Sequence, residues 1–155
     1  MEPTCWICLD DAGDLHTVCG CANRRVHMEC ISRWQLQQSG QVEEHQCRFC
    51  FESLPDWRDV MMPKNSEPKS CKLKIEFEGK RYYIEIQPGE PKEQVVARMA
   101  QLVGININLC SMSFEIGLPL SNEKKVTLHG MCAMEDALRL ACARAGQKNV
   151  RSTTT

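Results

Sequence analysis

Seven cysteines and one histidine in the first 50 residues occur in closely spaced pairs, and both residue types bind transition metals. The pairs are Cys5-x2-Cys8, Cys19-x1-Cys21, His27-x2-Cys30 and Cys47-x2-Cys50. Two cysteines two residues apart can present both thiolates to one tetrahedral ion, so four such pairs supply the ligands of two closed zinc sites. A closed site leaves no position for water chemistry, and we therefore expect two structural Zn2+ ions and no catalytic metal.

The rest of the sequence agrees with metal-binding cysteines. Its apolar runs are too short to cross a bilayer, and Met1–Cys5 lacks the basic and apolar parts of a secretory signal. These features predict a cytoplasmic or nuclear protein without a membrane span. Reducing compartments disfavour structural disulfides, so clustered cysteines in such a protein are expected to bind metal. The isolated Cys71, Cys110, Cys132 and Cys142 are expected to be buried as small apolar residues.

The charge distribution argues against a nucleic-acid partner. Residues 1–57 contain four arginines against nine acidic residues, and residues 58–155 contain fifteen basic against eleven acidic residues. Neither part has a block of basic residues suited to binding phosphates.

Differences in composition and hydrophobic periodicity divide the chain into four predicted segments. Residues 1–57 form the zinc domain, which is too small to fold without the free energy of metal binding. Residues 58–70, which include Pro63 and Pro68, are a predicted linker. Residues 71–148 show strand and helix periodicity and are predicted to form an α+β domain, followed by a disordered tail over 149–155.

The second domain shows an orderly succession of elements. Alternating apolar residues predict strands over 73–77 and 82–86, joined by a tight turn at Gly79–Lys80. A helix is predicted between Pro91 and Gly104, then strands near 112–116 and 126–128, then a helix from Met134 to Gly146. This order resembles the ubiquitin-like β-grasp. Because no final strand is evident and no motif fixes the fold, a generic α+β domain is the alternative.

The order of four cysteines, a histidine and three cysteines is similar to that of two zinc-finger families. One is the RING-CH (RING-variant) group of ubiquitin ligases, and the other is the PHD finger, which reads histone tails. Cys19-Gly20-Cys21 and the His-x2-Cys-Ile-x2-Trp run ending at Trp34 resemble RING-CH domains. His45 stands where PHD fingers usually have an aromatic residue, whereas the five residues between Cys21 and His27 suit a PHD finger better.

The RING-CH resemblance implies that the two zinc sites interleave in a cross-brace. Cys5, Cys8, His27 and Cys30 would bind one ion, and Cys19, Cys21, Cys47 and Cys50 the other. It also implies an E3 ubiquitin transferase that docks a ubiquitin-charged conjugating enzyme and promotes transfer to substrate lysines. Such a ligase forms no covalent intermediate and acts by positioning.

The same resemblance implies where the conjugating enzyme binds. Ile7 and Trp34 match residues of the family's docking groove. Arg48 stands where many ligases have proline, and it could replace the basic residue that usually follows the last ligand, a position held here by Phe51. The C-terminal domain would then recruit substrate or a partner of the ubiquitin system. The alternative functions are a PHD-type histone reader and a non-catalytic, zinc-stabilised interaction scaffold.

Overall fold

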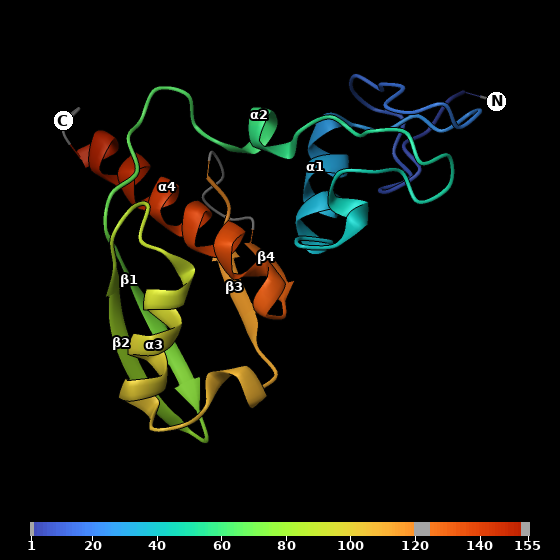
Figure 1. Cartoon of the computed structure of the whole chain (residues 1–155). Helices are drawn as coiled ribbons and strands as arrows, with labels where there is room; N and C mark the ends of the chain where they lie inside the picture. Colours follow the sequence, from blue (N-terminus) through green and yellow to red (C-terminus); the bar gives the residue numbers. More distant parts are fainter. Residues whose placement is uncertain (1, 120–124, 153–155) are drawn as a thin grey trace. The chain divides into compact units, whose positions relative to one another are not determined.

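The structure is a computed structural model that describes residues 2–119 and 125–152, and the chain forms two compact units (Figure 1). Unit 1 is Met1–Met62 and unit 2 is Pro63–Thr155. The division lies beyond residue 57, where the zinc domain was predicted to end. The difference arises because the short helix α2, Trp57–Met61, buries Trp57 and Met61 and belongs to unit 1.

Unit 1 consists largely of loops around one longer helix. Its elements are α1, Met28–Gln37, the 3-10 turn η1, Val42–Glu44, and α2. Isolated bridges join the loops at Cys5 and Arg25 and at His16 and Val26. Cys5, Val26 and Ile31 form a small buried core. So small a core is consistent with a fold that depends on metal for part of its stability.

A buried polar network attaches α2 to the rest of unit 1. The Glu44 side chain, only 4% exposed, accepts hydrogen bonds from Trp57 Nε1 and from the Gly40 amide, both at 2.8 Å. Gln35 Nε2 donates to the carbonyls of Glu44 at 2.8 Å and Pro55 at 2.7 Å. Helix α2 thus occupies the first residues of the predicted linker 58–70, and Trp57 joins this segment to η1.

Unit 2 has the predicted order of strand, strand, helix, strand, strand, helix. Its strands pair as two separate antiparallel hairpins, β1 with β2 and β3 with β4. The described residues therefore form two small sheets rather than one, and the β-grasp stays a prediction. The elements are β1 (Cys71–Phe77), β2 (Lys80–Ile86), α3 (Lys92–Val103), η2 (Ile107–Leu109), β3 (Ser113–Gly117), β4 (Lys125–His129), η3 (Met131–Ala133) and α4 (Met134–Ser152).

The hydrophobic core of unit 2 draws on both hairpins and both long helices. Ile84 and Ile86 of β2, Val95 of α3, and Met134 and Leu138 of α4 are buried together. Half-buried Leu73, Ile75 and Phe114 pack against them from β1 and β3. None of the described helices has the length and apolar character needed to span a membrane.

The turn between β1 and β2 differs by one residue from the predicted Gly79–Lys80 turn. Phe77 pairs with Lys80, so Glu78 and Gly79 are the central residues, with φ of 47° and 75°. Two central residues with positive φ define a type I′ turn, whose twist matches that of the flanking strands.

Helix α4 continues past Gly146, where the sequence predicted its end, and reaches Ser152. Gly146 instead lets the backbone of Glu67 pass close to α4, because a Cβ at position 146 would collide with it. The Lys69 amide also donates to the Cys142 carbonyl of α4 at 3.0 Å. The end of the predicted linker thus packs on unit 2. Helix α4 includes residues 149–152 of the predicted disordered tail, and residues 153–155 lie outside the described part.

The four isolated cysteines do not share one environment. Cys142 is buried, with its Sγ 3.9 Å from that of half-buried Cys71. Cys110 is half-buried and Cys132 is exposed. The expectation of burial is therefore confirmed for Cys142 and wrong for Cys132.

Candidate metal centres

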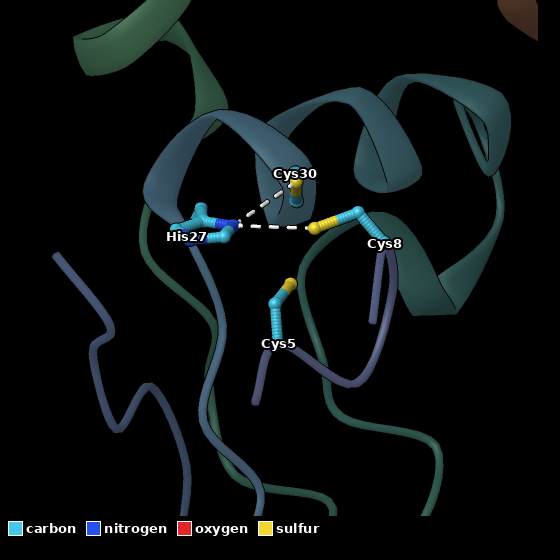
Figure 2. Close-up of side chains that lie close together, drawn as sticks. All are labelled: Cys5, Cys8, His27 and Cys30. Atoms are coloured by element: carbon cyan, nitrogen blue, oxygen red, sulfur yellow. Dashed lines mark hydrogen bonds between the residues drawn. The ribbon is translucent and has the colours of Figure 1, made fainter. Parts of the chain in front are cut away.

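The first cluster brings together Cys5, Cys8, His27 and Cys30 (Figure 2), whose ligand atoms all lie within 4.8 Å of one another. His27 Nδ1 is 3.4 Å from Cys8 Sγ and 3.7 Å from Cys30 Sγ. Zn–S bonds of about 2.3 Å and Zn–N bonds of about 2.0 Å in a tetrahedron place neighbouring ligand atoms roughly 3.6–3.8 Å apart. The cluster therefore has nearly the spacing that a zinc ion requires.

The His27 ring is oriented by a backbone group outside the cluster. His27 Nε2 lies 2.8 Å from the Ala12 carbonyl oxygen, which can only accept, so Nε2 carries the proton and donates. Nδ1 is then left with its lone pair facing the thiols, as metal ligation requires. This contact could not be predicted from residue types, because any residue at position 12 supplies a backbone carbonyl.

The second cluster brings together Cys19, Cys21, Cys47 and Cys50, again within 4.8 Å of one another. Cys21 Sγ lies 3.7 Å from Cys47 Sγ, close to the S–S edge of a tetrahedral zinc site. All eight predicted ligands thus gather in two groups of four that alternate along the chain, as the resemblance implied. Two clusters of four ligands each can hold two zinc ions.

The first and last cysteine pairs sit in loops of the same conformation. The Leu9 amide donates to the Cys5 carbonyl at 2.8 Å, and the Phe51 amide donates to the Cys47 carbonyl at 2.9 Å. Leu9 and Phe51 have φ of 64° and 61°, in the left-handed region that glycine favours. Each loop thus turns sharply after its second cysteine, which directs both thiols of the pair to one side.

Backbone groups already favour one thiolate in each cluster. Burial raises the pKa of the Cys5 thiol, but backbone hydrogen bonds, the largest with Cys8, outweigh it and bring the pKa down to about 6. Burial likewise raises the pKa of Cys47, but backbone hydrogen bonds outweigh it and bring the pKa down to about 6. Burial and neighbouring thiols raise the pKa of Cys21 and Cys30 to about 12. The positive charge of a bound ion is what would make these last two thiols deprotonate as well.

A shallow apolar groove lies beside the second cluster. Trp6 and Trp34 meet edge to face there, with ring centroids 6.0 Å apart and planes at 71°. Two of the three predicted partner-binding residues, Trp34 and Arg48, line this groove together. Ile7 is not part of its lining and instead packs half-buried against the core around Ile31.

Three further residues that line the groove were not predicted from the sequence: Trp6, Arg24 and Phe49. The Arg24 guanidinium lies 3.9 Å from the Phe49 ring centroid and 5.4 Å from that of Trp6. Phe49 is 54% exposed although it is a large apolar residue. Trp6 and Phe49 each lie between the two cysteines of a pair, and both line the groove. Their place between paired ligands could have marked Trp6 and Phe49 as groove residues from the sequence. No sequence pattern marks Arg24.

Comparison with known proteins finds similarity to a viral protein. The chain is 40% identical over 52 residues to the protein named E3 ubiquitin-protein ligase LAP of Swinepox virus (strain Kasza). The similarity covers 32% of this chain and 31% of the viral protein, so the chain spans less than a third of that relative. No family model matches the chain, and no solved structure matches it. The similarity and the two four-ligand clusters together support a RING-like zinc finger.

Proposed function

We propose that this chain is a RING-type E3 ubiquitin-protein ligase of the RING-CH class. The observation that carries the proposal is the alternating arrangement of two four-ligand clusters beside a groove lined by aromatic side chains. Similarity to a viral protein named as an E3 ubiquitin-protein ligase supports the same class. The eight ligands would bind two structural zinc ions, whose role is to hold the loops that form the groove.

The groove would bind a ubiquitin-conjugating enzyme charged with ubiquitin. Trp34, half-buried against Trp6, offers an apolar anchor of the kind that dominates interface energies. Exposed Arg48 offers hydrogen-bond donors at the rim of the groove. Ile7 packs against the core of unit 1 and would hold the loop of the first cysteine pair in place. Docking orders the thioester so that the amine of a substrate lysine attacks its carbonyl and releases the enzyme's thiol. The ligase contributes by restricting this encounter.

Unit 2 would recruit the protein substrate or a partner of the ubiquitin system. We propose a ubiquitin-like module for this role on the basis of its element order, and a cytoplasmic or nuclear location for the protein. The separation of the chain into two compact units supports such a division of labour.

The proposal is tested by a ubiquitination assay against a panel of conjugating enzymes, with the zinc-loaded chain and its Trp34→Ala variant. We expect the native chain to form ubiquitin conjugates with at least one enzyme. Loss of a central aromatic anchor costs about 2 kcal/mol or more, which is roughly a thirtyfold loss of affinity. Trp34→Ala should therefore nearly abolish transfer.

Two measurements make the outcome interpretable. Val42→Ala serves as the control, because Val42 is also apolar, is 70% exposed and does not line the groove. Zinc content measured on each variant separates loss of docking from loss of fold. No conjugates with any enzyme, combined with binding of a methylated histone peptide, would overturn the ligase assignment. A zinc-loaded Trp34→Ala chain with full activity would remove Trp34 from the docking site.

A further inference from the structure

A groove of about 650 Å³ in unit 2 separates the two hairpins. Its walls are residues 72–77 of β1 and residues 110–116 leading into and along β3, and its floor includes Met99, Met134 and Leu138. Neither β2 nor β4 lines it. The groove therefore runs along the edge of β1 that faces away from β2 and the edge of β3 that faces away from β4 (Figure 1).

The hydrogen-bond pattern of β1 shows which backbone groups face this groove. A two-residue type I′ turn makes Phe77 and Lys80 a hydrogen-bonded pair, and such pairs alternate along an antiparallel ladder. Lys72, Lys74 and Glu76 consequently direct their N–H and C=O groups away from β2. The carbonyl of Glu85, opposite Lys72, obeys the same alternation, because it faces away from β1 and accepts from Arg98 at 2.8 Å.

The same reasoning applies to β3. The Gly130 amide donates to the Met112 carbonyl at 2.9 Å, and these two residues continue the register that pairs Ser113 with His129. The backbone N–H and C=O groups of Met112, Phe114 and Ile116 therefore point toward β4. Ser113 and Glu115 direct their backbone groups away from β4 and toward the groove. Within the described part of the chain, no backbone hydrogen bond joins β1 to β3.

We propose that this groove binds an extended segment of another protein as an added strand between β1 and β3. One strand has two hydrogen-bonding edges, so a single bound segment would pair with both open edges at once. Half-buried Leu73, Ile75 and Phe114 give the groove an apolar inner face, which suits a strand with apolar residues at alternate positions. The inference concerns unit 2 alone and does not depend on ubiquitin transfer.

The charges on β1 specify the other face of the bound segment. Lys72, Lys74 and Glu76 are exposed on its outer side, and Lys74 already lies 2.9 Å from Glu76. Opposite charges on adjacent strands attract and like charges repel, so the segment should carry acidic residues opposite Lys72 and Lys74. Glu76 and the exposed Glu115 of β3 also line the groove, and they disfavour acidic residues at their end of it. The β1 strand of a second copy carries two lysines and one glutamate at these outward positions, so it offers only one acidic residue to Lys72 and Lys74. The charge pattern thus favours a different protein whose strand alternates apolar residues with polar ones that are acidic opposite Lys72 and Lys74.

The test uses a nine-residue synthetic peptide alternating valine and glutamate, added to the full zinc-loaded chain. Amide hydrogen exchange followed by NMR should slow by about tenfold or more at the groove-facing amides when a bound strand pairs with them. These amides are Lys72, Lys74, Glu76, Ser113 and Glu115. The amides of Arg81 and Tyr83, on the far edge of β2, should not change. A peptide of the same composition without the alternation is the ligand control.

Two proline variants test the edge directly. Lys74→Pro removes a groove-facing N–H while leaving the β1–β2 ladder its bonds, which proline tolerates on an edge. Tyr83→Pro is the matched control, because Tyr83 pairs with Lys74 and its N–H faces the opposite edge. We expect Lys74→Pro to weaken peptide binding by about tenfold or more, since it removes both a bond and steric access, and Tyr83→Pro to leave binding unchanged.

Several outcomes would overturn the proposal. These are no protection with the alternating peptide, protection of Arg81 and Tyr83 instead, and a self-associated chain that protects the groove amides without peptide. If Lys74→Pro fails to fold by circular dichroism, the exchange pattern of the native chain decides.

Discussion

Leu9 and Phe51 hold a backbone conformation that costs most residues free energy. Both follow the second cysteine of a pair, both have φ near 60°, and both side chains are largely exposed. For an L-residue this conformation costs about 1–2 kcal/mol relative to the right-handed region. The equivalent loops therefore store strain that metal ligation must offset, and the exposed side chains recover little of it by burial.

Replacing Leu9 by glycine should relieve this strain. We expect Leu9→Gly to raise the free energy of unfolding of the zinc-loaded chain by up to about 1 kcal/mol, since glycine adopts positive φ freely but gains entropy when unfolded. Val42→Gly is the control, because Val42 is equally exposed but helical, and there glycine should cost about 0.5–1 kcal/mol. Urea unfolding followed by tryptophan fluorescence measures both. If the two variants lower the free energy of unfolding equally, the backbone at Leu9 is not strained.

One buried hydrogen bond joins the short helix α2 directly to η1. Trp57 is fully buried, and its Nε1 donates to the carboxylate of Glu44, which is itself almost fully buried. We expect Trp57→Phe to lower the free energy of unfolding of unit 1 by about 1–3 kcal/mol, because it takes a donor from a buried charged group. Unfolding of the zinc-loaded chain in urea measures the change.

Met61→Leu provides the control for α2, since it alters another buried residue of the same helix without touching the hydrogen bond. Such a swap of similar volume should cost less than about 1.5 kcal/mol. If Trp57→Phe costs no more than Met61→Leu, the hydrogen bond does not hold α2.

The helices and strands of the chain were predictable where a periodic pattern repeats, and unpredictable where a single tertiary contact decides their bounds. Alternation over seven residues indicated β1, and helical spacing between Pro91 and Gly104 indicated α3. Helix α2 has five residues, which is too few to show a period, so nothing distinguished it from a linker. Gly146 suggested a helix end because the close approach of Glu67 depends on the tertiary structure.

For the whole molecule, the spacing of the cysteine pairs predicted two metal sites but not which pairs share an ion. That partnership depends on the path of the loops through space, and only the family resemblance indicated the alternating arrangement. The structure places the four-ligand groups in that arrangement. Because each site joins distant segments, losing one ligand should disturb all of unit 1, while unit 2 has its own core and should stay folded.

The most direct test is the number of zinc ions bound by the full chain, measured by native mass spectrometry on protein never exposed to chelator. Two closed four-ligand sites predict two zinc ions per chain. Cys30→Ser should bind fewer and lose the structure of unit 1, while the circular dichroism of the helices and strands of unit 2 persists. One zinc ion or none in the native chain, or two in Cys30→Ser, would contradict the interleaved zinc sites on which the proposed ligase depends.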